Sequence, residues 1–137
     1  MNPTSRSRLY AVQAFYALQI DAHTNLTAVL EVISISEKKG KGKILKLTKE
    51  IIDFAVKEKS SIDFIISNFS ERTKEMDKIN PLVYSILVIA LAEMLKFEKT
   101  KKPIIISEYI SIANDFFGKG ELSFVNAVLD KFSRSVI

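Results

Sequence analysis

Polar side chains that could contact a ligand lie near both ends of the chain. Asn126 and Asp130 are four residues apart, so they would share one face of a helix whose other residues are mostly apolar. Phe124 precedes them and could stack on a base. Arg6 and Arg8 lie near the N-terminus, and an arginine fork matches phosphate geometry through two parallel hydrogen bonds. These residue types favour recognition of a nucleic acid over catalysis.

Each of these residues also has a purely structural interpretation. Asn126 is equally consistent with a helix-surface amide or with a buried bond to a neighbouring helix end. Asp130 could pair with Arg134, four residues further on, and Phe124 could simply pack in the core. The two arginines are expected in a short polar arm that begins with Asn2-Pro3-Thr4-Ser5 and precedes the first helix. An unstructured, solvated arm is the alternative to a phosphate contact.

Catalytic, cofactor and metal sites have little support in the sequence. His23 is the only histidine and cysteine is absent, so no Cys-His nucleophile can be built. No H-E-x-x-H or calcium-loop pattern occurs, and Gly40-Lys41-Gly42-Lys43 lacks the spacing of a phosphate-binding loop. Glu93 and Glu108 lie among apolar residues, where an ionised carboxylate is costly unless it is paired. We expect both to orient helices by accepting bonds from helix starts or lysines, with a catalytic pair as the alternative.

Length and composition indicate one globular domain over residues 1–137. Apolar residues make up 47% of the chain and charged residues 26%, which suits a folded domain with a substantial core. The absence of cysteine and of a secretory signal leads us to expect a cytoplasmic protein. The longest apolar run, Ile86 to Ala92, is far shorter than the roughly 20 residues that cross a bilayer, so no membrane association is expected.

Positive charge is only slightly in excess but is unevenly distributed. Twenty basic and 16 acidic residues give a net charge of +4, which permits an anionic partner without requiring one. Lysines are crowded between Lys38 and Lys49, and again between Lys96 and Lys102. Such clusters are most often solvated loops and helix ends, although the first could add a nonspecific attraction for a polyanion.

Apolar residues recur at spacings of three and four, which predicts an all-α protein. Seven helices are expected, approximately over residues 9–20, 26–33, 44–57, 61–69, 81–94, 103–116 and 122–132. Asn80-Pro81 is a strong start signal, because asparagine accepts bonds from free N–H groups and proline lacks the donor that would go unpaired. Leu82 to Met94 is apolar on nearly all sides, so this helix should lie at the centre of the fold.

Three polar or glycine-containing segments are expected to connect these helices. Lys39-Gly40-Lys41-Gly42 is predicted to be a flexible connection, and Gly118-Lys119-Gly120 a turn before the last helix. Ser70 to Lys78 is highly polar, which suggests a connection between two helical halves, about 1–70 and 71–137.

Three blocks of the sequence resemble the NusB family of transcription antitermination factors. Arg8 to Tyr16 is similar to the family's R-x-x-A-V-Q-A-L-Y, and Ile86 to Met94 is similar to its L-R-I-A-L-Y-E-L helix. Pro103 to Lys131 is similar to P-x-x-x-x-I-N-E-A-I-x-L-A-x-x-F followed by K-F-V-N-G-V-L-D-K. The middle, about Ala22 to Lys78, matches only in length and helical pattern. The order and spacing of the three blocks make the resemblance specific.

The resemblance implies a NusB-like fold of about seven helices in two packed helical subdomains. The family motifs also have a glutamate at the positions of Glu93 and Glu108. Val88, Ala92 and Ala127 stand where the motifs usually have Arg, Tyr and Gly.

By this resemblance, the chain would be a bacterial, non-enzymatic factor that binds the single-stranded boxA element of nascent rRNA leader transcripts. It would pair with NusE, a ribosomal protein, and the complex would dock on RNA polymerase and help it pass termination signals. The residues expected near the RNA are Arg6, Arg8, Gly118, Lys119, Gly120, Glu121, Phe124 and Asn126. Tyr16 is expected near the protein partner, because a phenol at the end of a helix often keeps its hydroxyl accessible.

Two other functions compete with this one. The same fold resembles the N-terminal RNA-binding domain of bacterial rRNA cytosine methyltransferases, but those enzymes need a further Rossmann-like domain that 137 residues do not hold. A helical protein-protein adaptor or homo-oligomer, such as a homodimer formed through the apolar last helix, would not bind RNA specifically. Dimers that cover Phe124 and Asn126 would favour that alternative.

Overall fold

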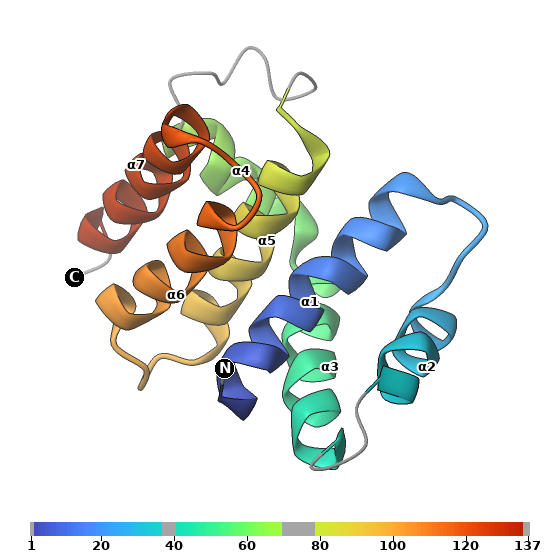
Figure 1. Cartoon of the computed structure of the whole chain (residues 1–137). Helices are drawn as coiled ribbons and strands as arrows, with labels where there is room; N and C mark the ends of the chain where they lie inside the picture. Colours follow the sequence, from blue (N-terminus) through green and yellow to red (C-terminus); the bar gives the residue numbers. More distant parts are fainter. Residues whose placement is uncertain (1, 37–40, 70–78, 136–137) are drawn as a thin grey trace.

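The computed structural model describes residues 2–36, 41–69 and 79–135, and within these ranges it contains helices and no strands. Seven helices follow one another along the described chain (Figure 1): α1 (Pro3–Ile20), α2 (Leu26–Ser36), α3 (Lys41–Lys57), α4 (Lys59–Phe69), α5 (Pro81–Lys96), α6 (Lys102–Asn114) and α7 (Lys119–Ser135). The predicted all-α fold class is therefore confirmed. The expected connection at Ser70 to Lys78 lies outside the described residues.

Asparagine side chains cap three of the helix starts. The Asn80 side chain accepts bonds from the N–H groups of Leu82, at 2.8 Å, and Val83, at 3.4 Å, ahead of Pro81, as predicted. Asn25 likewise caps α2 through the N–H of Ala28 at 2.9 Å. These caps satisfy backbone donors that have no partner within the helix.

The first helix begins earlier than the sequence analysis predicts. The Asn2 side chain accepts from the N–H of Ser5 at 2.8 Å, and Pro3 opens α1. Arg6 and Arg8 therefore lie inside the helix, so the expectation of a polar arm is wrong. The physical reason is that Asn2-Pro3 forms the same kind of start signal as Asn80-Pro81.

Two predicted connections are also shorter than expected. Lys39 and Gly40 lie outside the described residues, but Lys41 and Gly42 already belong to α3. Helix α7 begins at Lys119, so Gly120 is part of its first turn. Glycine is costly in a helix interior but less so in the first turn, where several N–H groups have no intrahelical partner anyway.

Helix α5 lies at the centre of the fold, as its apolar sequence predicts. Every residue from Ser85 to Met94 is buried, and α1, α3, α4, α6 and α7 all pack against this helix (Figure 1). The buried hydroxyl of Ser85 donates to the carbonyl of Pro81 at 2.8 Å, so it does not lack a partner. Val88 and Ala92 are fully buried, which places these two motif departures in the core.

The remaining helices cover α5 from several sides. Helices α1 and α3 pack closely together, and the buried Thr48 hydroxyl donates to the carbonyl of Ser7 at 3.0 Å. Helix α7 packs on α4, α5 and α6 through Val125, Val128, Leu129 and Phe132. Among the described elements, α2 contacts only α1 and α3, so it lies at the edge of the fold (Figure 1). No helix in the described ranges is both long enough and apolar enough to cross a membrane.

Candidate nucleic-acid interface

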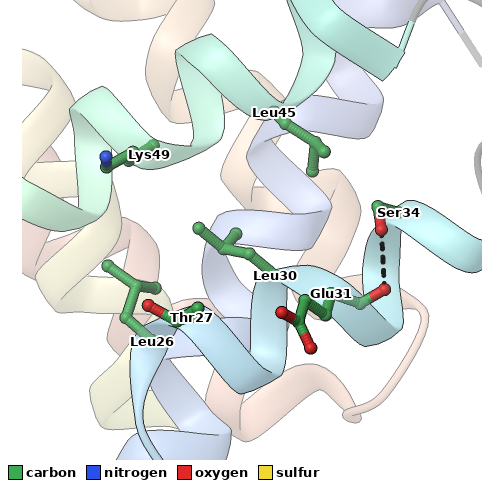
Figure 2. A pocket seen from close by; sticks show the side chains of 7 residues that line it. All are labelled: Leu26, Thr27, Leu30, Glu31, Ser34, Leu45 and Lys49. Atoms are coloured by element: carbon green, nitrogen blue, oxygen red, sulfur yellow. Dashed lines mark hydrogen bonds between the residues drawn. The ribbon is translucent and has the colours of Figure 1, made fainter.

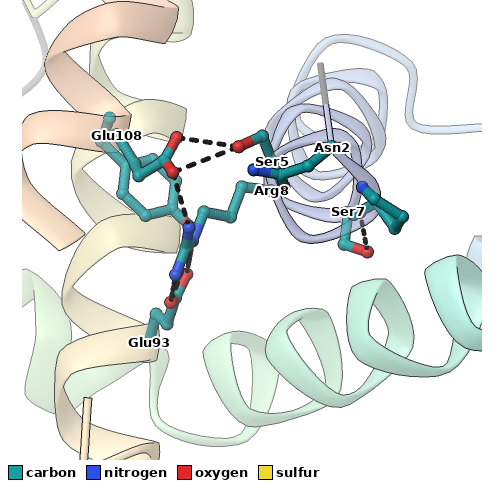
Figure 3. Close-up of polar contacts among 8 residues, drawn as sticks. Asn2, Ser5, Ser7, Arg8, Glu93 and Glu108 are labelled. Atoms are coloured by element: carbon teal, nitrogen blue, oxygen red, sulfur yellow. Dashed lines mark hydrogen bonds and ion pairs between the residues drawn. The ribbon is translucent and has the colours of Figure 1, made fainter. Parts of the chain in front are cut away.

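Arg8 is buried in an ionic cluster rather than exposed to a ligand (Figure 3). Its Nε lies 2.9 and 3.0 Å from the two carboxylate oxygens of Glu93, and its Nη2 lies 2.8 Å from Oε2. Its Nη1 lies 3.2 Å from Oε1 of Glu108. The side chain of Arg8 is only 6% exposed. The geometry therefore does not place Arg8 where a phosphate could reach it, which corrects the premise of the predicted contact.

Two hydroxyl groups complete this cluster. The phenol of Tyr109 donates to Glu93 at 2.7 Å, and the Ser5 hydroxyl lies 3.1 Å from both oxygens of Glu108. The cluster thus joins α1 to α5 and α6 (Figure 3). The expectation that Glu93 and Glu108 orient helices is confirmed, although their cationic partner is Arg8 rather than a lysine.

The charges of the cluster control the protonation of its members. Burial alone would lower the pKa of Arg8, but the hydrogen bond and charge of Glu93 outweigh that effect and raise it. Burial, together with the neighbouring Glu93 charge, raises the pKa of Tyr109 well above its ordinary value. Arg8 therefore stays charged and Tyr109 stays neutral as a donor.

Arg6 and Tyr16 are the predicted site residues on α1 that remain near the surface. Arg6 precedes Arg8 by two residues, which rotates it by about 200° around the helix and separates the two guanidinium groups. Arg6 and Tyr16 are both half-buried. The exposed side of α1 between them includes Gln13.

The predicted site residues at the start of α7 are accessible. Gly118, Lys119, Gly120 and Glu121 are all exposed, and Asn126 is exposed one to two turns further along the helix. Phe124 is half-buried and packs against the core, which agrees with its structural interpretation, while its contact with a base stays a prediction. Asp130 forms an ion pair with Arg134, and the hydrogen bond from Arg134 lowers the pKa of the Asp130 carboxyl.

An exposed aromatic residue that was not predicted as part of the site also lies at this end. Phe116 is 49% exposed and lies in the connection between α6 and α7, next to the half-buried Phe117. The signal was a pair of phenylalanines directly before Gly118, where a helix was expected to end. Phe116 therefore adds an aromatic surface beside the predicted turn.

A second missed group links α4 with α5. The Tyr84 hydroxyl donates to Asp63 at 2.5 Å, and Lys59 reaches the same carboxylate at 3.0 Å. The Lys59 ammonium also lies 5.7 Å from the centre of the Tyr84 ring. Burial and the hydrogen bond to Asp63 raise the pKa of Tyr84 to about 12. The apolar pattern of residues 82–94 gave no indication of this cluster.

The structure brings the predicted RNA-binding residues to two separate places. The first turn of α1 lies beside the middle of α6 through Ser5 and Glu108. The connection at Gly118 follows the far end of α6, and α1 and α7 have no contact within the described residues (Figure 1). Arg6 and Asn126 therefore belong to different surface regions.

An open groove lies between α2 and α3 (Figure 2). Its volume is about 320 Å³, and Leu26, Leu30 and Leu45 give it an apolar floor, with Glu31 and Lys49 at its sides. Across the parts of the chain that the structure describes, no three histidine or acidic side chains gather where they could hold a metal ion.

Comparison with known proteins agrees with this architecture. The model of the NusB family matches residues 5–134, which is nearly the whole chain. The chain belongs to the NusB family. The NusB match includes both regions that hold the predicted site residues.

Individual NusB relatives match along about nine tenths of their length. The transcription antitermination protein NusB of Rickettsia bellii is 30% identical, over 97% of this chain and 91% of the relative. The protein of the same name from Sinorhizobium medicae is 28% identical, over 99% of this chain and 89% of the relative.

Solved NusB structures have the same fold. T. maritima NusB superimposes with a TM-score of 0.82 and 25% identity, covering 98% of this chain and 92% of that one. A crystal structure of the antitermination factors NusB and NusE in complex with dsRNA gives a TM-score of 0.78 at 22% identity, with 98% of each chain covered. The predicted NusB-like arrangement of helices is thereby confirmed.

Proposed function

We propose that this chain is a transcription antitermination factor that binds boxA-type single-stranded RNA of rRNA leader transcripts together with NusE. The full-length match to the NusB family is the observation that carries the proposal. Relatives in the family are named transcription antitermination proteins, and one NusB of the same fold was crystallised with NusE and double-stranded RNA. In this proposal the protein acts in the cytoplasm as a non-enzymatic part of the RNA polymerase antitermination complex.

The exposed start of α7 is proposed as the surface that reads the RNA. Asn126 offers both a donor and an acceptor to a base edge, and Phe124 and Phe116 offer aromatic surface on which unstacked bases can pack. Lys119 can neutralise a phosphate, and the exposed Gly118 and Gly120 on either side of it carry no side chain that would cover their backbone groups. Single-stranded RNA is recognised through this combination of stacking and hydrogen bonds.

The residues of helix α1 are assigned two kinds of role, direct contact and positioning. Arg6 is assigned a phosphate contact and Tyr16 a contact with NusE, since both lie near the surface of α1. Arg8 is assigned a positioning role, because its guanidinium holds α1 against Glu93 and Glu108.

The test is binding of labelled boxA-type RNA and of a scrambled RNA, with and without NusE, across a salt series. We expect the boxA-type RNA to bind more tightly and NusE to strengthen that preference. Asn126→Ala should reduce the preference by about 1–3 kcal/mol, whereas Asn68→Ala, an exposed asparagine on α4, should not change it. Equal, weak binding of both RNAs that NusE does not affect would reject the proposal.

A homo-oligomer without specific RNA binding is the second candidate function. It is favoured by α2, where Val32 and Ile35 are 69% and 78% exposed on a helix that other described elements cover on one side only. Light scattering should then show a dimer that Ile35→Glu converts to a monomer. A monomeric wild-type protein would reject this candidate.

A further inference from the structure

Positive charge is concentrated where α5 ends and α6 begins. We call this region the basic corner and define it as Lys96, Lys99, Lys101 and Lys102. Glu98 is the only acidic residue between 96 and 102, so this segment carries a net charge of +3, against +4 for the whole chain. All four lysines reach the surface, Lys102 being half-buried and the other three exposed.

Two of the helix ends near the basic corner, the starts of α1 and α6, add to its positive potential, whereas the C-terminal end of α5 carries partial negative charge. Arg8 lies opposite Glu93, and Phe15 lies against Tyr84 further along, so α1 runs antiparallel to α5. The first turn of α1 is therefore level with the end of α5. Helix α6 starts at the same end of this layer (Figure 1), and helix N-termini carry partial positive charge.

A shallow groove continues from the basic corner along α6. It has a volume of about 460 Å³ and begins at Pro103 and Ile104, the latter 50% exposed. The side chains of Ser107 and Ser111 also line it. Glu108 borders the groove and shares the Arg8 guanidinium with Glu93, so these three side chains together keep one negative charge beside it. The groove thus offers exposed apolar atoms and hydroxyl groups next to the segment that carries the four lysines. Of these lysines, Lys96 places its ammonium 5.8 Å from the centre of the Phe54 ring on α3.

We propose that the basic corner and this groove form a second RNA contact, separate from the start of α7. The lysines would neutralise consecutive phosphates, while Pro103 and Ile104 pack against a ribose or a base. Lysines bind phosphates as point charges without reading sequence, so this contact adds affinity for the strand outside the recognised element. The inference rests on the proposed function and adds a surface to it.

RNA suits this surface better than an acidic protein segment does. The groove is shallow and presents one strongly exposed apolar residue, Ile104, which gives a peptide little to anchor in. The lysine ammonium groups and the serine hydroxyl groups can instead bind an RNA backbone, which carries regularly spaced phosphates.

The test compares two variants that remove the same charge from exposed lysines. K99Q/K101Q changes the basic corner, and K57Q/K131Q changes the ends of α3 and α7. Binding of labelled single-stranded RNA is measured by anisotropy across a salt series, with boxA-type and scrambled sequences. We expect K99Q/K101Q to reduce the slope of log K against log salt by about 1.4 for both RNAs, since each phosphate contact contributes about 0.7. K57Q/K131Q should keep the wild-type slope.

Each other outcome overturns the inference in a distinguishable way. An unchanged slope in K99Q/K101Q, with specific binding by the wild type, rejects the second contact and leaves the proposed function intact. An equal fall in both variants shows diffuse attraction by net charge instead of a local site. Competition by polyglutamate as strong as by RNA of equal charge assigns the corner to acidic proteins. Wild-type protein that binds no RNA rejects both proposals.

Discussion

Arg8 is the side chain on which the packing of α1 most depends. Its guanidinium makes hydrogen bonds or ion pairs with two carboxylates that lie on different helices. Burying charged groups costs several kcal/mol per ion, and the mutual attraction and hydrogen bonds must offset that cost. The intact cluster therefore adds little to the free energy of unfolding, but the loss of any one charged member leaves a buried charge without its partner.

Arg8→Ala should lower the free energy of unfolding by about 3–5 kcal/mol, because it leaves the buried Glu93 carboxylate without its cation. Urea denaturation followed by circular dichroism measures this change. Arg134→Ala, which removes an exposed ion pair on α7, is the control and should leave the unfolding midpoint unchanged. Equal effects of the two substitutions would contradict the role assigned to Arg8.

Tyr84→Phe should lower the free energy of unfolding by about 1–2 kcal/mol, because it removes the hydrogen bond to Asp63. The folded state raises the pKa of Tyr84 to about 12 from an unfolded value of 10.0, so it holds the phenolic proton more tightly. The contribution of this proton to the stability of the folded state is complete below pH 10 and is lost as the pH rises through 12.

Ultraviolet absorbance titration of the tyrosines checks this assignment. The wild-type protein should show a component that ionises near pH 12 and is missing in Tyr84→Phe. Tyr16→Phe, at a half-buried tyrosine on α1, serves as the control and should retain that component. If the component near pH 12 persists in Tyr84→Phe, it belongs to another tyrosine.

Single residues show where sequence reasoning succeeds and where it stops. The apolar surroundings of Glu93 and Glu108 correctly predicted a structural role. Their partner could not be predicted, because Arg8 is 85 residues from Glu93 and no local pattern links them. The exposed start of α7 was predictable from its polar and glycine residues, whereas its separation from Arg6 depends on how α6 packs.

Helix starts can be predicted from local sequence where an asparagine precedes a proline. Asn80-Pro81 correctly predicted the start of α5, and the same dipeptide at Asn2-Pro3 would have predicted the start of α1. The charged residues Arg6 and Arg8 instead suggested an arm. That expectation was wrong because Glu93 and Glu108 pair with Arg8, so the charged side chain can be buried.

Asn80→Ala should destabilise the fold by about 1 kcal/mol, because the N–H groups of Leu82 and Val83 lose their acceptor. Thermal or urea unfolding measures the change. Asn68→Ala is the control, since Asn68 is exposed within α4 and does not cap a helix. Asn80→Asp should retain most of the stability, and a loss as large as that of alanine would argue against capping.

At the level of the whole molecule, we propose that the two helical halves unfold as one domain. Helix α5 of the second half packs against α1, α3 and α4 of the first, so neither half has a complete core of its own. Domains of this size usually unfold in a single cooperative transition.

Leu129→Ala in α7 should lower the free energy of unfolding by about 2–5 kcal/mol, since Leu129 is fully buried. Tyrosine fluorescence reports on α1, α5 and α6, and circular dichroism reports on all helices. Both should shift to the same lower urea midpoint. Separate transitions by the two probes would show that the halves unfold independently.

The pairing of Arg8 with Glu93 also sets an order of events during protein synthesis. Arg8 is synthesised before its partner, which is added 85 residues later. At a synthesis rate of 5–20 residues per second, the arginine waits roughly 4–17 s for that carboxylate. During this interval α1 can already pack against α3, while its charged side remains hydrated. The nascent chain therefore completes its buried ionic contacts only after the central helix has emerged.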